Sequence, residues 1–281
     1  MITPSLPPTE KPLIVGIVNI TEDSFSDGGR YLDPTSALAH ARRLRADGAD
    51  IIELGPAASH PDSVPVTAAE EQRRLAPVLE PLAAEGVPVA VDSFQPQTQR
   101  FAIAEGAAFL NDIQGFGTPA MYPELAASRC RLIVMHRVRP VAPATRVRTD
   151  QAEVRAGIGR FFTQRLAALR TAGIGRDRLV VDPGLGYFLG STPEPSLAAL
   201  AGIRELKDAF GAPVLVSPSR KSFLRALTGK DVARSGPATL AAEIFAAWQG
   251  VDYIRTHDVA ATRDALTLLT AIAKEARTVS P

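Results

Sequence analysis

Residues 179–190, Leu-Val-Val-Asp-Pro-Gly-Leu-Gly-Tyr-Phe-Leu-Gly, join a short apolar run to a carboxylate and a glycine-rich loop. The run 179–181 has the composition of a strand buried on both faces, and Asp182 follows it directly. Taken alone, an Asp-Pro-Gly sequence after a strand is more often a turn than part of a functional site. The meaning of Asp182 therefore depends on whether the same pattern recurs along the chain.

The order of apolar strand, polar strand end and helix recurs eight times. Strands are predicted at residues 13–18, 51–54, 87–91, 108–110, 131–135, 178–181, 213–217 and 251–255. Helices are predicted at 34–45, 67–85, 95–105, 119–128, 149–172, 194–210, 260–277 and, in more than one piece, within 221–248. Thr67 and Glu70 have the spacing of a capping box at the start of the second helix.

Eight such units predict an α/β fold of the (β/α)8 or TIM-barrel type, which commonly has about 250 residues. The chain has 281 residues, and no linker or change of composition divides it. A doubly wound open sheet is the main alternative, but it usually has fewer repeats, and no G-x-G-x-x-G motif follows the first strand. We therefore predict a single barrel domain over residues 12–281, preceded by a flexible tail at residues 1–11.

The composition limits the partners and the compartment. The net charge is only +1, with 46% hydrophobic and 22% charged residues, so neither nucleic acid nor an anionic membrane is expected to attract the whole molecule. The first ten residues contain three prolines and lack the apolar core of a signal peptide. The single cysteine, Cys130, lies beside an apolar run and is expected to be a buried, unreactive thiol. These features predict a cytoplasmic protein with small-molecule ligands.

In a TIM barrel, the carboxyl ends of all eight strands meet on the face that carries the active site. At these ends, the sequence places an unusual number of polar and charged side chains. With one methionine among them, the candidates are Asn19, Ser59, His60, Asp92, Asn111, Met135, His136, Asp182, Ser219, Arg220, Lys221, Ser222, Arg255 and His257.

Asp92, Asn111 and Asp182 offer carboxylates and an amide, which suit the amino and ring N–H groups of a flat heterocycle. Each also has a simpler explanation when taken alone, because Asp92 can cap the next helix and the other two lie in turn-like sequences. The coincidence of all three at strand ends favours a binding site.

Lys221, Arg255 and His257 offer positive charge near the ends of the last two strands, where barrels often bind phosphate. Asn19 adds an amide. Alternatively, Lys221 and Arg255 are solvated surface charges, and His136 and His257 are hydrogen-bonded polar groups at the edge of the core. For His136 the structural and functional explanations are equally favoured. Together the two groups predict a ligand in which a heterocycle is joined to a phosphate.

Seven segments in order resemble the dihydropteroate synthases of folate biosynthesis. They are GIVNITEDSFSDGG at 16–29, VDS at 91–93, NDI at 111–113, VMH at 134–136, DPGLG at 182–186, SRKS at 219–222 and RTHD at 255–258. The resemblance implies a transferase that condenses 6-hydroxymethyl-7,8-dihydropterin diphosphate with p-aminobenzoate. The products would be 7,8-dihydropteroate and pyrophosphate, with Mg²⁺ as cofactor and a homodimer formed through the late helices.

The resemblance also implies roles for individual residues. The pterin would be bound by Asp92, Asn111, Met135, Asp182 and Lys221, and the diphosphate by Asn19, Ser59, His60, Arg255 and His257, with Asn19 also contacting Mg²⁺. The p-aminobenzoate would be bound by Ser219, Arg220, Ser222, Tyr187 and Phe188. Asp92, Lys221, Arg255 and His257 are the expected catalytic residues. The loops 21–29 and 55–66 would exclude water from a cationic reaction centre.

Two departures from the family pattern are expected to matter. The usual Glu-Ser-Thr-Arg-Pro-Gly of the second loop is Ala-Ala-Ser-His-Pro-Asp at 57–62, so a fixed cation is replaced by a titratable ring. The usual Phe-Gly-Lys after DPGLG is replaced by Tyr-Phe-Leu at 187–189. The chain thereby resembles the mobile sulfonamide-resistant subgroup. We therefore expect it to reject sulfonamides, because added bulk can exclude a drug that extends beyond the substrate.

Two other functions fit part of this pattern. A pterin-binding methyltransferase barrel shares the Asp and Asn contacts but transfers methyl from methyltetrahydrofolate to a cobalamin partner. The SRKS and RTHD segments argue against it. A non-catalytic pterin-binding protein is supported only by the changes in the second loop.

Overall fold

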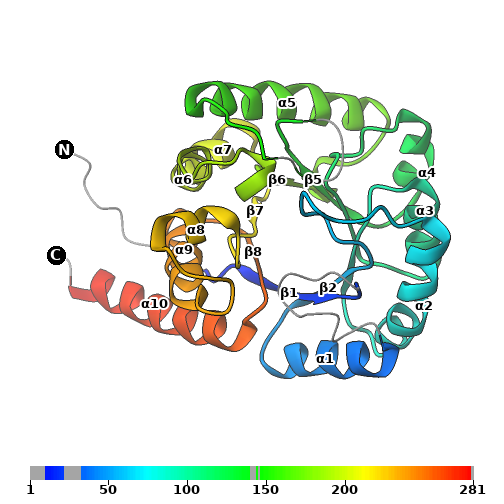
Figure 1. The fold of residues 1–281 in the computed structure, drawn as a ribbon, viewed down its shortest axis with the longest axis horizontal. Helices are drawn as coiled ribbons and strands as arrows, with labels where there is room; N and C mark the ends of the chain where they lie inside the picture. The colour runs from blue at the N-terminus through cyan, green and yellow to red at the C-terminus, as the bar shows by residue number, and fades with distance from the viewer. Residues whose placement is uncertain (1–9, 22–32, 140–143, 145, 280–281) are drawn as a thin grey trace.

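The structure, a computed structural model, describes residues 10–21, 33–139, 144 and 146–279. Eight parallel strands pair in the order β6-β5-β4-β3-β2-β1-β8-β7. A bridge between Val181 and Val214 joins β6 to β7 and completes the ring. Figure 1 shows the helices arranged around the outside of these strands. The predicted TIM barrel is confirmed.

The strands are β1 (Leu13–Asn19), β2 (Ile51–Gly55), β3 (Val89–Asp92), β4 (Phe109–Asp112), β5 (Arg131–Met135), β6 (Leu179–Asp182), β7 (Leu215–Val216) and β8 (Tyr253–Thr256). The helices are α1 (Pro34–Ala46), α2 (Ala68–Ala84), α3 (Pro96–Ala104), α4 (Tyr122–Ala127), α5 (Gln151–Thr171), α6 (Glu194–Ala201), α7 (Ile203–Phe210), α8 (Ser222–Thr228), α9 (Gly236–Trp248) and α10 (Val259–Val279). Each expected strand is present within a few residues of its predicted place.

Three predictions of local structure were wrong in detail. The single helix expected over 194–210 is two helices, α6 and α7, that meet at Gly202, a residue with low helix propensity. The helix expected over 119–128 begins as a 3₁₀ turn at Pro119–Met121. Thr67 does cap α2 by accepting the Glu70 N–H at 3.3 Å, but the Glu70 carboxylate pairs with Arg73 and Arg74 instead of completing the box.

The barrel interior is built in layers, because alternate residues of a strand point to the same side. Each strand contributes one side chain to an apolar layer low in the barrel. Its members are Val15, Ile51, Ala90, Phe109, Ile133, Val180, Leu215 and Tyr253. Two residues further along the same strands stand Ile17, Glu53, Asp92, Asn111, Met135, Asp182, Ser217 and Arg255. We call this second set the polar ring, since six of its eight members are polar or charged.

Other predictions concern the edges of the fold. Cys130 is buried, with Sγ 3.0 Å from the Ala107 carbonyl oxygen, and burial raises the pKa of its thiol, as expected for an unreactive cysteine. No helix in the described parts of the chain combines the length and the apolar composition that crossing a membrane requires. Residues 1–9 of the predicted tail and 22–29 of the predicted first loop lie outside the described residues.

Candidate active site

The polar ring brings together residues that are far apart in the sequence. Asp92 lies directly opposite Asn111 in the pairing of β3 with β4, and Met135 lies opposite Asp182 in the pairing of β5 with β6. These four residues are the strand-end residues that the sequence assigned to pterin binding. Their grouping follows from the parallel register, which brings strand ends to the same level.

An ion-pair network crosses the centre of the ring. The Arg255 guanidinium contacts the carboxylate of Glu53, and its Nη2 lies 3.2 Å from Asp92 Oδ2. Asn111 Nδ2 donates to Glu53 Oε2 at 3.1 Å, and Glu53 is fully buried. Burial raises the pKa of Glu53 to about 7 and also raises the pKa of Asp92. Arg255 is therefore held in place by two carboxylates inside the barrel.

Two members of the polar ring, Asn111 and Asp182, carry buried oxygen acceptors. Among the described residues, the buried Asn111 Oδ1 has no hydrogen-bond partner. Asp182 Oδ1 accepts the Gly184 N–H at 2.7 Å, which is the turn bond expected of an Asp-Pro-Gly sequence. Burial raises the pKa of Asp182 to about 6. Asp182 is thus both a turn residue and a buried acceptor, and the two explanations of its sequence are compatible.

A cationic cavity of about 170 Å³ adjoins the ring at the ends of β1, β2, β7 and β8. Its wall includes all five residues predicted to bind the diphosphate, namely Asn19, Ser59, His60, Arg255 and His257, together with Asp92, Ser219, Arg220 and Lys221. Burial lowers the pKa of Lys221 to about 8, so its ammonium is charged at neutral pH. The cavity therefore combines at least three cations with hydroxyl and amide groups, a composition that favours phosphate.

His257 differs from its predicted charge. Burial, followed by the nearby cations Arg220, Arg255 and Lys221, lowers the pKa of His257 well below its usual value. Its Nδ1 lies 2.9 Å from Ser219 Oγ. The His257 imidazole is therefore neutral before a ligand binds. The sequence prediction that His257 supplies positive charge to the cavity was wrong for that state. It can still donate a hydrogen bond.

The loop after β7 is held in a strained conformation next to the loop after β6. Arg220 has φ = 60°, unusual for a residue other than glycine, and its N–H donates to Thr239 Oγ1 at 3.1 Å. Ser222 begins α8, and a Cβ on Gly186 would lie 3.0 Å from Ser222 Oγ. The two predicted p-aminobenzoate loops are therefore in contact.

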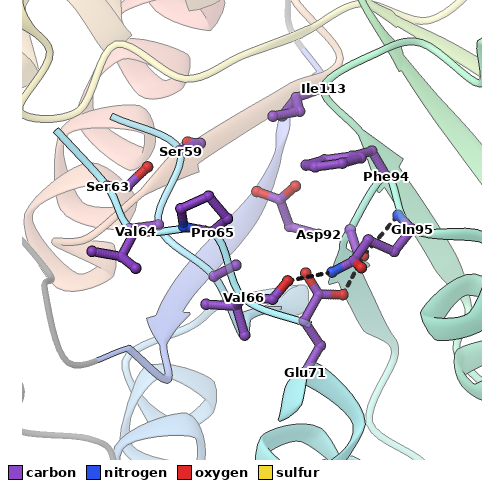
Figure 2. A pocket seen from close by; sticks show the side chains of 13 residues that line it. Ser59, Ser63, Val64, Pro65, Val66, Glu71, Asp92, Phe94, Gln95 and Ile113 are labelled. Carbon is purple, nitrogen blue, oxygen red and sulfur yellow. Dashed lines mark hydrogen bonds between the residues drawn. The ribbon is translucent and has the colours of Figure 1, made fainter. Parts of the chain in front are cut away.

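An apolar wall stands beside the polar ring. Met135, Phe188 and Ile113 pack together, with Phe94 and Tyr187 at the edge of the cluster. Lys221 Nζ lies 4.8 Å from the centre of the Phe188 ring. A second cavity, of about 240 Å³, opens between the loop 57–66 and Phe94, and Figure 2 shows the Asp92 carboxylate between them. Asp92 thus contributes to both cavities.

Two residues of the site were missed in the sequence. Glu53 interrupts the apolar strand β2 and stands two residues after Ile51, so strand periodicity could have placed it inside the barrel. Arg225 of α8 lines the cationic cavity, and its buried Nε has no hydrogen-bond partner in the described part of the chain. No motif marked it. His136, by contrast, is buried with Nδ1 3.2 Å from the Pro183 carbonyl oxygen. This contact supports the explanation that His136 is a hydrogen-bonded structural group and not a ligand-binding one.

The donor set suits a metal that arrives on phosphate. Within residues 10–21, 33–139, 144 and 146–279, no group of three His, Cys, Asp or Glu side chains could hold a metal ion. Mg²⁺ commonly needs only one or two protein ligands when substrate phosphates and water complete its shell. Asn19 supplies an amide oxygen in the phosphate-sized cavity, which fits that mode of binding.

A barrel that holds acceptors for a heterocycle beside a cationic cavity has the features of a pterin-binding enzyme. The family described as "Pterin binding enzyme" matches residues 15–257 of the chain. The type-2 dihydropteroate synthase of Escherichia coli is 54% identical over 265 residues, 94% of this chain and 97% of that protein. The type-3 enzyme of the same organism is 48% identical over 259 residues, 92% of this chain and 98% of that protein. The chain belongs to the dihydropteroate synthase family.

Solved structures agree with this placement. A Xanthomonas albilineans dihydropteroate synthase with 4-aminobenzoic acid matches with a TM-score of 0.84 and 37% identity, covering 97% of this chain and 95% of that chain. A Yersinia pestis dihydropteroate synthase in complex with a sulfonamide drug matches with a TM-score of 0.85 and 31% identity, covering 94% of this chain and 95% of that chain.

Proposed function

We propose that this chain condenses 6-hydroxymethyl-7,8-dihydropterin diphosphate with p-aminobenzoate, releasing pyrophosphate, and that it does so in the cytoplasm. The observation that carries the proposal is the junction of two environments at Asp92. On one side are the buried acceptors of the polar ring, and on the other is the cationic cavity. A pterin diphosphate has the matching polarity, with donor groups on the ring and negative charge on the tail.

The pterin would lie on Asp92, Asn111 and Asp182, with Lys221 above and Met135 beside it. The unpartnered Asn111 Oδ1 supports this placement, because a buried acceptor without a partner costs about 1–3 kcal/mol until a ligand supplies a donor. The p-aminobenzoate would meet Ser219, Arg220, Ser222, Tyr187 and Phe188. The related Xanthomonas albilineans enzyme has been solved with 7,8-dihydropteroate, a product that joins both halves.

The diphosphate would occupy the cationic cavity with Asn19, Ser59, His60, Arg255 and His257. When bound at Asn19, Mg²⁺ would neutralise charge on the phosphate oxygens. Arg255 and Lys221 would be cations next to the leaving group, and their charge would favour departure of pyrophosphate. Asp92 and Asp182 lie where positive charge develops on the pterin methylene, so they favour the same step. The amine of p-aminobenzoate is nucleophilic when neutral, and no side chain is required as its base.

A coupled pyrophosphate assay with purified protein tests the proposal. Pyrophosphate release should require both substrates and Mg²⁺, and dihydropteroate should form in equal amount. A methyltransferase would release no pyrophosphate under these conditions. A protein that binds the pterin diphosphate but gives no turnover would contradict the proposal in favour of a binding function.

We further propose that the enzyme rejects sulfonamides through the Tyr-Phe-Leu segment at 187–189. Phe188 is packed against the site beneath Lys221, and the Arg146 guanidinium lies 5.5 Å from the centre of the Tyr187 ring. Arg146 also pairs with Asp62 of the second loop, Nη1 to Oδ1 at 2.7 Å. The segment therefore contacts Lys221 on one side and Arg146, which pairs with the second loop, on the other.

Phe188→Ala should lower the sulfonamide inhibition constant by about tenfold or more, because removing the ring opens space in the pocket. The KM for p-aminobenzoate should change less. Tyr187→Ala, which removes a neighbouring aromatic ring outside the Lys221 contact, is the matched comparison. Inhibition constants for the wild type that equal those of a drug-sensitive synthase would contradict the proposal.

We also propose a homodimer through the late helices. Phe245 and Trp248 of α9 and Leu268 and Ile272 of α10 expose large apolar side chains, and α9 packs on α10. Apolar residues gathered on neighbouring helices are typical of subunit interfaces. Sedimentation equilibrium should give twice the chain mass, and Ile272→Glu should give the mass of one chain.

A further inference from the structure

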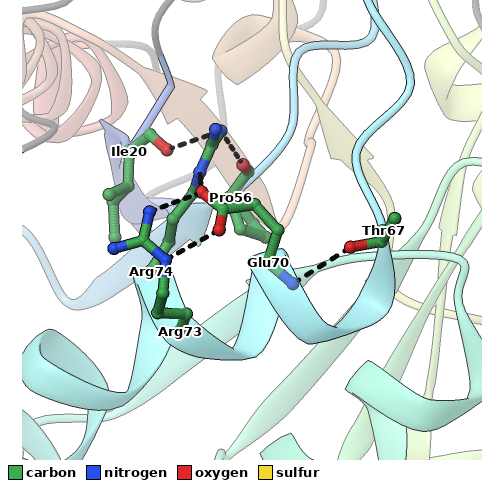
Figure 3. Close-up of polar contacts among 6 residues, drawn as sticks. All are labelled: Ile20, Pro56, Thr67, Glu70, Arg73 and Arg74. Atoms are coloured by element: carbon green, nitrogen blue, oxygen red, sulfur yellow. Dashed lines mark hydrogen bonds and ion pairs between the residues drawn. The ribbon is translucent and has the colours of Figure 1, made fainter.

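Arg74 is a buried cation that lies outside both cavities described as the substrate site. It belongs to α2, and only 8% of its side chain is exposed. Its Nη1 donates to the Pro56 carbonyl at 3.0 Å and to the Ile20 carbonyl at 3.5 Å, and its Nε donates to Glu70 Oε1 at 2.7 Å. Figure 3 shows the Arg74 contacts to Ile20, Pro56 and Glu70.

The two carbonyls belong to the residues that immediately follow β1 and β2. These strand ends are also joined directly, because the Ile20 N–H donates to the Gly55 carbonyl at 2.9 Å. The Asn19 side chain rests on this junction, and a Cβ on Gly55 would lie 3.3 Å from Asn19 Oδ1. Residues 57–60, which follow Pro56, line the cationic cavity. Arg74 thus binds the backbone from which the first diphosphate-binding residues project.

Glu70 fixes the guanidinium from the other side. It lies in the first turn of α2, immediately after the second loop, and its N–H is capped by Thr67. Hydrogen bonds from Arg73 and Arg74 lower the pKa of Glu70 to about 2, so the carboxylate stays charged over the working range of the enzyme. The guanidinium therefore connects the beginning of the second loop, its end and the beginning of the first loop.

A purely structural explanation fits this arrangement poorly. A buried guanidinium needs several partners, whereas an apolar side chain would fill the same space without a desolvation cost. The planar fork of arginine can, however, hold two separate carbonyls in a fixed relation, which an apolar residue cannot do.

We propose that Arg74 is a positioning residue that sets the geometry of Asn19 and residues 57–60 for the diphosphate of the substrate. The proposal rests on the proposed function and adds to it a residue that lines neither of the two cavities assigned to the substrates. Loss of Arg74 should therefore change the KM for the pterin diphosphate and not the KM for p-aminobenzoate.

Arg74→Met should raise the KM for the pterin diphosphate by about 10- to 100-fold, since small displacements of binding groups have effects of that size. The KM for p-aminobenzoate, measured at saturating diphosphate, should stay within about twofold of the wild-type value. Arg74→Lys keeps the charge but cannot hold both carbonyls and Glu70 together, so its KM should be intermediate.

Arg178→Met is the matched control. Arg178 also binds main-chain carbonyls, at Leu125, Ala126 and Cys130, but it precedes β6 and so lies at the opposite end of the barrel. Its loss should lower thermal stability without changing either KM. If Arg74→Met does not fold, Arg74→Lys decides the question.

The outcomes separate the two proposals. A wild type and an Arg178→Met variant that form no dihydropteroate would overturn the proposed function. If both are active, an unchanged diphosphate KM in the Arg74 variants would overturn the positioning role. Equal increases in both KM values would also overturn it. So would an Arg178→Met variant in which the KM for the pterin diphosphate rises and the KM for p-aminobenzoate does not.

Discussion

Lys221→Ala should lower kcat/KM for the pterin diphosphate by about 10²- to 10³-fold, the usual cost of removing one charge-stabilising group from an active site. The ammonium lies at the cavity wall, over the Phe188 ring and close to Asp92 and Asp182. Stability should change little, because burial already weakens the charged form of this lysine. The coupled pyrophosphate assay and a thermal melt measure both quantities.

Lys207→Ala is the control for this variant. Lys207 is ion-paired, with Nζ 2.7 Å from Asp252 Oδ1, and Asp252 precedes β8 and lies at the end of the barrel away from the site. Its activity should match the wild type. Wild-type turnover in Lys221→Ala would show that the site has been assigned to the wrong residues.

The pH profile gives a second measure of the same lysine. Lys221 loses its charge as the pH rises through about 8, and Asp182 loses its charge as the pH falls through about 6. We therefore expect kcat/KM to fall on both sides of this window. Lys221→Arg should move the alkaline fall to higher pH, because a guanidinium remains charged there.

Arg255→Met should cost both activity and stability. The sequence alone predicts that Arg255, as a strand-end residue, can be removed with little loss of stability. The structure leads us to expect the opposite, since Arg255 is the cation that faces the fully buried Glu53. Breaking a buried ion pair by removing one partner typically costs about 3–5 kcal/mol. The loss should be smaller at pH 5, because the raised pKa of Glu53 lets it become neutral there.

A double variant tests whether the unpaired charge of Glu53 causes this loss of stability. Glu53→Gln in the Arg255→Met background removes the stranded charge, so the free energy of unfolding should recover most of the loss. Activity should remain low in both variants, because the cation next to the diphosphate is missing from each. Urea denaturation at pH 8 measures the stability. A single variant as stable as the wild type would contradict the network described around Glu53.

The sequence was sufficient to predict the fold because the repeated unit is local. Each apolar strand and each amphipathic helix is encoded within a few residues, and eight copies leave few alternative architectures. The break at Gly202 was missed because both halves of the segment are good helices on their own. The Glu70 side chain was misassigned because Arg73 and Arg74, three and four residues later on the same helix, bind its carboxylate, and these helical spacings were not weighed against the capping box.

The site was predictable where a polar residue ends a strand or lies in the loop that follows it. Asp92, Asn111 and Asp182 meet that condition, and the parallel register brings their strands together. Glu53 was overlooked because it stands inside its strand, and Arg225 because it comes from a helix. The lowered pKa of His257 depends on burial and on nearby cations from other parts of the chain, so it follows from the assembled cavity and not from the motif.

The apolar layer beneath the polar ring has a consequence for proton exchange with bulk water. Eight side chains from Val15 to Tyr253 form an apolar layer below the buried acids, so we expect protons to reach Asp182 and Glu53 from the substrate side. A bound substrate blocks that route. The protonation state present when the substrate enters should therefore persist through the chemical step, and kcat should vary less with pH than kcat/KM.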